Sequence, residues 1–260
     1  MGAINDLPMS EILKIAILNG QIPRFLYKYT TADNALLALE GGTAYFARFS
    51  QFNDEYEGFA NLDVNNSLTE WAVFLENNGI FGVEASFLMA TIQNNPSQAA
   101  QIIRDVIEEN QKNNGFLCLS AKSNNVLMWA HYADQNKGCC LEYDLLADPD
   151  IFCRIKKIKY DDDTIAYNYL QNNGGAFEAM FHKSKQWEYE DEYRVISIGH
   201  PGPIKLKEGS LTGIIFGPKI DDEKKEELIT KVKTSHCGVK LSEAVKGANP
   251  SVLDIQVINV

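Results

Sequence analysis

The chain has 260 residues, of which 45% are hydrophobic and 23% are charged. This composition is that of an ordinary globular protein with a sizeable core, and the length suits one large domain or two small ones. The formal net charge of -11 argues against broad binding to nucleic acid or anionic membranes, because an acidic surface repels phosphate groups. It leaves room for a small basic pocket that holds one phosphorylated ligand.

The N-terminal segment and the cysteines predict a cytoplasmic protein. Asp6 stands where a signal peptide carries basic residues, and the apolar stretch at 12–18 is too short and too interrupted for a membrane span. The five cysteines are an odd number and lack the spacing of metal sites. We therefore expect buried free thiols, no membrane association and no bound metal.

Periodicity and turn residues predict secondary structure along the first half of the chain. Gly20 and the pair Gly41-Gly42 stop two helices, and each helix is followed by an apolar strand. The predicted elements are a helix at 9–19, a strand at 25–29, a helix at 31–40, a strand at 43–49, and mostly helical structure over 67–113.

The second half carries more strands, separated by two longer helical segments. The predicted strands are at 116–120, 138–143, 153–160, 193–197, 212–216 and 253–260, and the predicted helices at 126–134, 164–185 and 221–233. Because helices and strands alternate poorly, we predict one α+β domain over 1–260 rather than a doubly wound parallel sheet. Its central sheet is expected to be mixed or antiparallel, with flanking helices and a helical insertion or cap at 67–114.

The segment from Trp187 to Arg194 concentrates acidic and aromatic residues. On a strand, Glu188, Glu190, Glu192 and Arg194 would share one face. Clustered carboxylates repel one another and raise the pKa of at least one of them, unless a cation such as Arg194 compensates. The simpler alternative is a solvated acidic strand edge.

A second segment combines aromatic residues with a histidine on a predicted short helix. Trp129, His131 and Tyr132 stand here, and Ser120 ends the strand before it. These groups could hold a polar ligand. The alternative is a core helix with one hydrogen-bonded histidine, and hydroxyls that only cap it.

Two further segments offer polar side chains. Asn53, Asp54 and Glu57 present oxygens to a cation or a ligand hydroxyl, or they only stabilise a loop; their spacing is not that of a calcium loop. Tyr27, Lys28 and Tyr29 alternate on a predicted strand, where an inward lysine would suit a phosphate or a carboxylate.

Together these segments resemble an uncharacterised bacterial family, the domain of unknown function number 2971. The family pattern includes LYKY, FNDPxE, a CxS…WxHYxxxxxG segment and a KxxxWxYExEYR segment. In this chain they correspond to 26–29, 52–57, 118–138 and 183–194. Glu55 replaces the proline of the second motif, which loosens that turn. The family has no agreed activity, so the resemblance implies kinship rather than function.

The order of residues is also similar, more distantly, to ADP-ribosyltransferase-like domains. That resemblance implies that Lys28 with Thr30 holds a ribose or phosphate of NAD, that Ser120 and Tyr132 line the site, and that Glu190 or Glu192 is the catalytic carboxylate. The carboxylate would stabilise an oxocarbenium-like state while the nicotinamide–ribose bond breaks. Lys28 departs from the His or Arg expected there, which puts NAD use in question.

Three functions remain open from the sequence. The first is an NAD-consuming ADP-ribosyltransferase-like enzyme in a toxin or phage-defence setting, acting on a macromolecular target. The second is a non-catalytic module that binds a nucleotide or a protein, and the third a metal-dependent hydrolase or nuclease using Asp54, Glu57 and the Glu190/Glu192 pair. The predicted catalytic residues are Glu192, Glu190, Tyr132 and His131, and the predicted ligand-binding residues are Tyr27, Lys28, Tyr29, Asn53, Asp54, Glu57, Ser120, Trp129, Trp187 and Arg194.

Overall fold

The computed structural model describes residues 7–54, 61–62, 65–162, 166–168, 170, 178–235 and 238–258. The chain folds into two compact units. The first unit comprises Met1–Arg48, Asn114–Ile158 and Gln186–Val260, and the second comprises Phe49–Asn113 and Lys159–Lys185. The prediction of a single domain with 67–114 as an insertion or cap stays a prediction.

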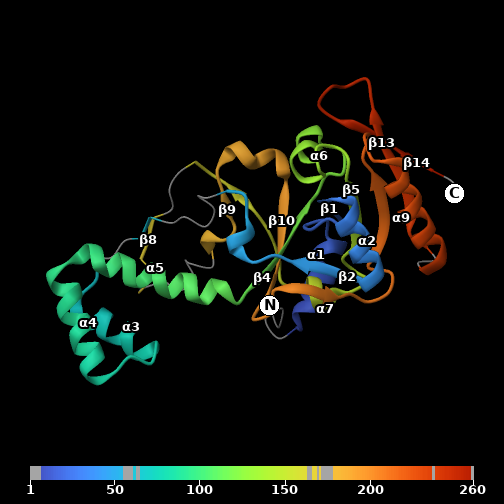
Figure 1. Cartoon of the computed structure of the whole chain (residues 1–260). Coiled ribbons are helices and arrows are strands. Elements are labelled where there is room, and N and C mark those ends of the chain that lie inside the picture. Colours follow the sequence, from blue (N-terminus) through green and yellow to red (C-terminus); the bar gives the residue numbers. More distant parts are fainter. Residues whose placement is uncertain are drawn as a thin grey trace. The chain divides into compact units, whose positions relative to one another are not determined.

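The first unit is built on one mixed eight-stranded sheet (Figure 1), which confirms the predicted α+β class. Its strand order is β14-β13-β12-β5-β1-β4-β10-β6. The strands are β1 (Phe25–Thr30), β4 (Gly115–Ser120), β5 (Cys139–Asp144), β6 (Ile155–Lys157), β10 (Glu192–Ser197), β12 (Leu211–Phe216), β13 (Lys240–Lys246) and β14 (Leu253–Val257). A separate antiparallel pair joins β2 (Thr43–Phe46) to β11 (Gly202–Lys205).

The connections follow from the strand directions. All neighbours in the large sheet are antiparallel except β12 and β13, which run parallel. Parallel neighbours need a crossover, and α9 (Asp222–Ser235) supplies it. The residues of β4 and β5 are buried almost throughout, as expected for inner strands covered on both faces.

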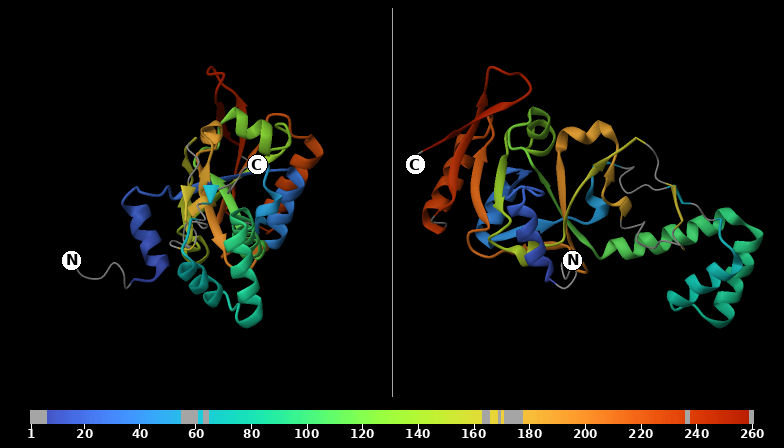
Figure 2. Two further views of the ribbon diagram at one scale, coloured as in Figure 1. Left: turned by 90° about the vertical axis from the view of Figure 1, so that its left-hand side faces the viewer. Right: turned by 180° about the vertical axis from the view of Figure 1, so that it is seen from behind.

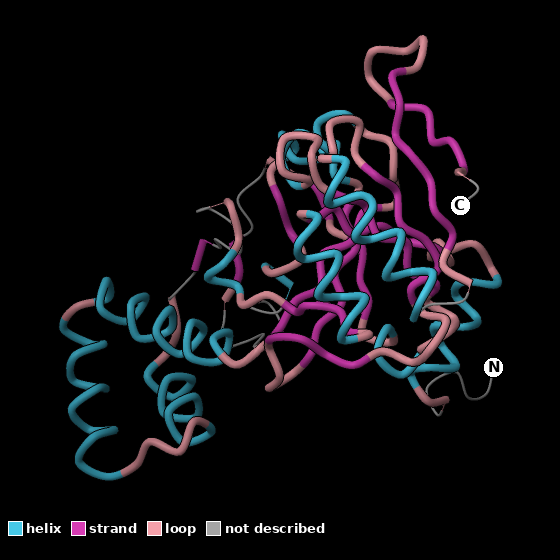
Figure 3. Tube along the Cα trace, turned by 45° about the vertical axis from the view of Figure 1, so that its right-hand side comes forward, coloured by secondary structure: helices cyan, strands magenta, loops and turns pink. Residues whose placement is uncertain are grey.

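The main core lies on one face of this sheet. Helices α1 (Met9–Leu18), α2 (Ala32–Gly41), α7 (Pro149–Phe152) and α9 contribute apolar side chains to it, together with Leu26, Leu141 and Phe216 from the strands. Figure 3 shows helices packed over the strands of this unit. Thr31 is the N-cap residue of α2, and its side chain accepts a hydrogen bond from the backbone N–H of Asn34. Gly42 is the C-cap residue and has the left-handed φ of 57°.

The opposite face carries a smaller cluster under helix α6 (Val126–Tyr132). Met128 and Trp129 from the helix pack against Tyr29 and Cys140 from the strands. Figures 1 and 2 show α6 beside the segment that leads into β10, at the same end of the sheet. This end holds most of the residues that the sequence singles out.

The second unit is mainly helical. It contains α3 (Leu68–Asn77), α4 (Gly82–Asn94), α5 (Pro96–Lys112), the 3-10 turn η1 (Phe49–Gln51) and the short strand pairs β3 (Asn61–Leu62) with β8 (Ala166–Tyr167) and β7 (Lys159–Tyr160) with β9 (His182–Lys183). Ser67 and Glu70 form a reciprocal capping box at the start of α3. Trp71, Phe74 and Ile103 lie in a core of their own.

Two predictions for the segment before β10 are wrong. The helix predicted at 164–185 contains strands β8 and β9 in its described residues. The strand face predicted from Glu188 to Arg194 is interrupted, because Lys185–Glu190 forms the 3-10 helix η2 and Asp191 has φ 44°. Sequence reasoning also missed β11, β13 and α7.

The described residues contain no helix that is both long enough and apolar enough to span a membrane. Four cysteines in the described part are free thiols, namely Cys118, Cys139, Cys140 and Cys153. Cys237 lies outside the described residues.

Candidate functional site

Three neighbouring strands place predicted site residues on one face of the sheet. Ser120, at the end of β4, is the register partner of Tyr27 on β1 and of Glu192 on β10. Side chains of directly opposed residues in antiparallel strands point to the same face. Tyr27, Ser120 and Glu192 therefore form one row across the sheet.

The pairing between β1 and β4 is short at this row. Strand β1 pairs with β5 from Phe25 to Thr30, whereas its register with β4 consists of the Tyr27–Ser120 pair. Beyond this pair, β1 and β4 no longer follow one another. The polar row therefore lies where the sheet changes from one group of strands to the other.

Helix α6 is fixed over this row by its N-cap residue. The Asn125 side chain accepts hydrogen bonds from the backbone N–H groups of Leu127 and Met128, and its amide donates to the carbonyl of Tyr189 at 3.1 Å. One side chain thus begins the helix and ties it to η2. The sequence signal was an asparagine directly before an apolar helical run.

Trp129 on α6 and Tyr29 on β1 pack against each other and fix α6 to the sheet. The Trp129 indole is fully buried, donates to the carbonyl of Ser123 at 2.9 Å and meets the Tyr29 ring edge to face, with centroids 5.2 Å apart. The Tyr29 hydroxyl donates to the carbonyl of Lys122 at 2.8 Å. Both residues hold the helix and the loop after β4 in place.

Glu190 is the buried carboxylate nearest to α6. Its side chain is 3% exposed, and its Oε1 accepts a hydrogen bond from the Tyr132 hydroxyl at 2.5 Å. The Ser120 hydroxyl donates to the backbone carbonyl of Glu190 at 2.6 Å. Glu190 therefore contacts two other predicted residues, Ser120 through its backbone carbonyl and Tyr132 through its side chain.

Glu192 and Arg194 form a second buried polar group. The guanidinium of Arg194 donates through Nε to Oε1 of Glu192 at 2.8 Å and through Nη2 to Oε2 at 3.0 Å. Arg194 is 0% exposed and Glu192 4% exposed, and β10 lies between β4 and β6. The solvated acidic strand edge considered from the sequence is therefore wrong, whereas the shared face of Glu192 and Arg194 is confirmed.

The charges of this pair affect the pKa of the nearby Cys118 thiol. Burial raises its pKa well above the usual value, and the negative charge of Glu192 raises it further. The positive charges of Arg194 and Lys28 oppose this rise. Lys28 is half-buried and is the register partner of Leu141, so its side chain starts from the other face of β1. Its charge nevertheless acts on the Cys118 thiol.

Asp191 separates the two buried glutamates. Its φ of 44° is left-handed, a conformation that Asp tolerates better than most residues, and it turns the chain from η2 into β10. Its carboxylate lies 2.9 Å from Nζ of Lys157 and 3.5 Å from Nζ of Lys122. Burial alone would raise the pKa of Asp191, but hydrogen bonds and charges from these two lysines outweigh it and lower the pKa.

Three aromatic rings form a surface beside Glu190, which we call the aromatic row: Trp187, Tyr189 and His131. The rings of Trp187 and Tyr189 are 6.1 Å apart and inclined by 39°, and those of Tyr189 and His131 are 5.9 Å apart. The Tyr189 hydroxyl lies 2.9 Å from Nδ1 of His131. His131 is exposed while the other two rings are half-buried, so the row borders solvent.

Tyr27 and Glu142 extend the polar row towards β12. The Tyr27 hydroxyl donates to Oε2 of Glu142 at 3.2 Å, and the Thr212 hydroxyl donates to Oε1 at 2.8 Å. Burial, followed by the charge of Glu142, raises the pKa of Tyr27 to about 12. Sequence reasoning missed Glu142 and Tyr189; the alternation of aromatic and acidic residues at 187–193 was a signal for the latter.

Of the third predicted segment, Asn53 and Asp54 belong to the second unit, and Glu57 lies outside the described residues. In the part of the chain that the structure describes, no three His, Cys, Asp or Glu side chains are grouped as a metal ion would require.

Comparison with known proteins finds a similarity to one family over part of the chain. No curated protein and no solved structure matches the chain. A model of the family described as Protein of unknown function (DUF2971) matches residues 128–195, a range that runs from α6 through η2 into β10 and includes Tyr132, Glu190 and Arg194. Over this range the chain is similar to that family of unknown function.

Proposed function

We propose that the protein is an NAD-consuming, ADP-ribosyltransferase-like enzyme with its site on β1, β4 and the 3-10 helix η2 that leads into β10. The observation that carries the proposal is the buried carboxylate of Glu190, held by the Tyr132 hydroxyl and adjoining Ser120. The resemblance requires an early polar strand, a hydroxyl-bearing strand and a carboxylate-bearing strand. These strands are neighbours in the sheet, although they lie far apart in the sequence.

The aromatic row supports a nucleotide as the ligand. Planar heterocycles stack on aromatic side chains, and base–aromatic stacking contributes about 1–3 kcal/mol per base. Trp187, Tyr189 and His131 offer such rings at the solvent boundary beside Glu190. The half-exposed ammonium groups of Lys122 and Lys157 lie near the same turn, where they would attract a pyrophosphate in spite of the acidic surface.

The proposed reaction breaks the bond between C1′ of the nicotinamide ribose and the ring nitrogen. Nicotinamide leaves with the electron pair of that bond, as a neutral molecule. An acceptor oxygen or nitrogen forms the new bond to C1′ and gives up its proton to solvent or to a carboxylate. Glu190 would stabilise the positive charge that develops on the ribose and orient a ribose hydroxyl, a role in which a preorganised group is most effective.

Nicotinamide release from NAD, with and without cell lysate as acceptor, tests the proposal. We expect Glu190→Gln to lower the release rate by about 10²–10³-fold, because the amide keeps an oxygen for Tyr132 but loses the charge. Glu188→Gln is the matched control, since Glu188 lies on the same 3-10 helix but is exposed. Calorimetric NAD binding should stay within about threefold in both variants.

Wild-type protein that binds no NAD and releases no nicotinamide would overturn the proposal. Equal loss of release in Glu188→Gln and Glu190→Gln would also count against it. Glu192→Gln is a less direct test, because it removes the charge that compensates buried Arg194 and so acts on stability as well.

A non-catalytic nucleotide-binding module is the second candidate. It is favoured by the fact that Glu190 and Glu192 already have partners within the protein, Tyr132 and Arg194. In that case NAD or another nucleotide would bind without nicotinamide release. Glu190→Gln would then change the affinity alone.

A further inference from the structure

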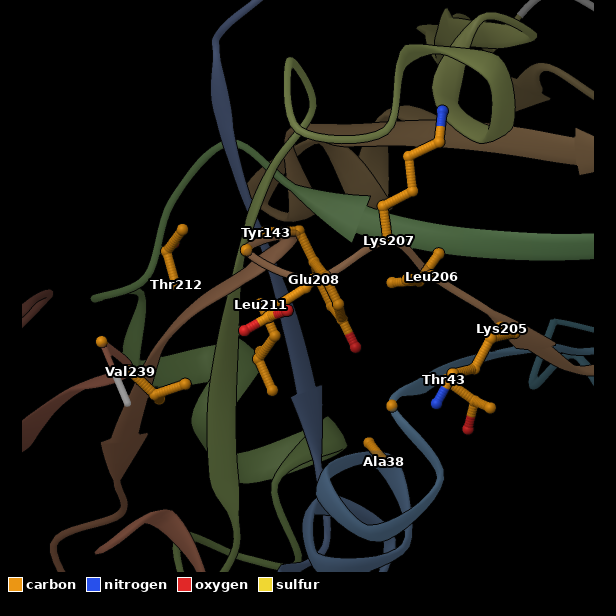
Figure 4. A pocket seen from close by; sticks show the side chains of 13 residues that line it. Ala38, Thr43, Tyr143, Lys205, Leu206, Lys207, Glu208, Leu211, Thr212 and Val239 are labelled. Carbon is orange, nitrogen blue, oxygen red and sulfur yellow. The ribbon is translucent and has the colours of Figure 1, made fainter. Parts of the chain in front are cut away.

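A cavity of about 520 Å³ lies in the first unit, and neither Glu190 nor the residues in contact with it line it. It is lined by the turn between α2 and β2, the end of β5, the segment from β11 into β12, and the residues before β13 (Figure 4). Cavities of about 300–1,000 Å³ are typical of small-molecule sites. None of its lining residues belongs to the aromatic row or to the buried carboxylates, so its ligand is independent of the proposed function.

Tyr143 presents an unpaired hydroxyl to this cavity. The side chain is 2% exposed, yet its hydroxyl makes no hydrogen bond within the described part of the chain. Figure 4 shows the ring reaching into the cavity with its hydroxyl at the tip. Buried tyrosine hydroxyls usually find a partner. Burial also raises the pKa of Tyr143, so the phenol keeps its proton and can donate it to a ligand.

Lys205 brings a positive charge to the same cavity. Its ammonium donates to the carbonyl of Gly41 at 2.7 Å and makes no ion pair among the described residues. Lys207, which also lines the cavity, is by contrast bound to Asp148 and Asp150. Lys205 thus retains free donors and an uncompensated charge.

The Lys205 ammonium lies close to the backbone of the turn after α2. Gly42 has φ 57°, and a Cβ atom there would lie 2.8 Å from Nζ of Lys205. Thr43, the next residue, contributes a hydroxyl to the same wall. Glycine at this position therefore leaves the ammonium room beside the cavity.

Apolar side chains form part of the remaining walls. Ala38, Leu206, Leu211 and Val239 line the cavity beside the polar groups. In Figure 4, the carboxylate of Glu208 is directed away from Lys205, towards Leu211. The cavity therefore joins apolar side chains to the ammonium of Lys205 and to hydroxyl groups, among them those of Tyr143 and Thr43.

We propose that this cavity binds a small monocarboxylic acid with an apolar chain. The carboxylate contacts the Lys205 ammonium and accepts a hydrogen bond from Tyr143, and the chain packs against the apolar walls. A carboxylate is the group that satisfies both donors at once, and the bound chain loses its contact with water.

Calorimetric titration of the full chain with octanoate tests the ligand class, with 1-octanol and octylamine as probes of the same chain length. We expect octanoate to bind and each other probe to bind at least about tenfold more weakly, because neither offers the negative charge. If octanoate does not bind, the proposal is wrong. If octylamine or 1-octanol binds as well as octanoate, the ligand is not an acid and the proposal is equally wrong.

Two variants locate the binding site. Tyr143→Phe and Lys205→Gln should each weaken octanoate binding about tenfold, since each removes a donor to a charged group. Lys219→Gln, at an exposed lysine that does not line the cavity, is the matched control and should leave binding unchanged. Tyr143→Phe should not lower the melting temperature, because its hydroxyl has no partner to lose among the described residues. Unchanged octanoate affinity in both cavity variants would place the ligand elsewhere and overturn the assignment.

Discussion

The two faces of the large sheet bury different kinds of side chain. The face covered by α1, α2, α7 and α9 buries apolar side chains such as Leu26, Leu141 and Phe216. The face that carries α6 buries Ser120, Glu190, Glu192 and Arg194 as well as apolar groups. The comparison shows where the molecule gains its stability and where it retains polar groups that a core does not need.

The burial of apolar side chains and the burial of charged side chains have opposite effects on stability. Burial of a leucine or phenylalanine side chain contributes about 1.5–3 kcal/mol. Removal of a charged group from water costs several kcal/mol, and the partner of a buried ion pair offsets this cost only when the geometry is good. The bidentate geometry of Arg194 on Glu192 and the short contact of Tyr132 with Glu190 meet that condition.

Breaking the buried ion pair should have the largest effect. We expect Arg194→Met to lower the free energy of unfolding by about 3–5 kcal/mol, because it leaves the Glu192 charge buried without its main partner. Urea unfolding measures the loss. The double variant Glu192→Leu/Arg194→Met should regain most of it, since neither charge of the pair then remains buried. A loss in the single variant below about 1 kcal/mol would contradict the distinction between the faces.

A truncation on the apolar face should affect stability alone. Leu141→Ala removes part of a side chain that is 2% exposed and packs in the main core, so we expect a loss of about 2–5 kcal/mol. Nicotinamide release per folded molecule should stay as in the wild type. If release fell about tenfold at unchanged folded fraction, the apolar face would take part in function as well.

The smallest expected effect concerns the turn at Asp191. Because the native pKa is lowered, the ion pairs with Lys157 and Lys122 stabilise the protein above the unfolded-state pKa of about 3.9, and this contribution is lost as pH falls through the native pKa. Asp191→Asn keeps the left-handed turn but not the charge. It should cost about 0.5–1 kcal/mol at neutral pH, the range of partly exposed pairs.

Urea unfolding at neutral and acidic pH checks this prediction. The difference between wild type and Asp191→Asn should shrink as the pH falls below about 4, because the wild-type carboxylate then takes up its proton. Asp134→Asn is the control, at another aspartate with positive φ that is exposed. A cost that stays constant down to low pH would mean that backbone conformation, rather than charge, sets the role of Asp191.

Many elements could be predicted from the sequence because their signals are local. Helices α1, α2, α6 and α9 follow apolar periodicity with stop residues, and β1, β4, β5 and β12 follow short apolar runs. The segment at 164–190 failed, because short strands and a 3-10 turn have no periodicity long enough to recognise. The family match over residues 128–195 includes the whole of the motif segment at 183–194 and the part of the segment at 118–138 that begins at Met128.

The sequence by itself determined the α+β class and pointed to the residues around Tyr132, Glu190 and Arg194, since these depend on composition and on patterns within a few residues. Only the tertiary structure decided that Glu190 contacts both Ser120 and Tyr132, that Glu192 is paired with Arg194 rather than exposed, and that Tyr143 and Lys205 line a common cavity. Except for the Glu192–Arg194 pair within β10, these contacts join segments that lie far apart in the sequence, and they depend on strand order and register, which no local pattern encodes.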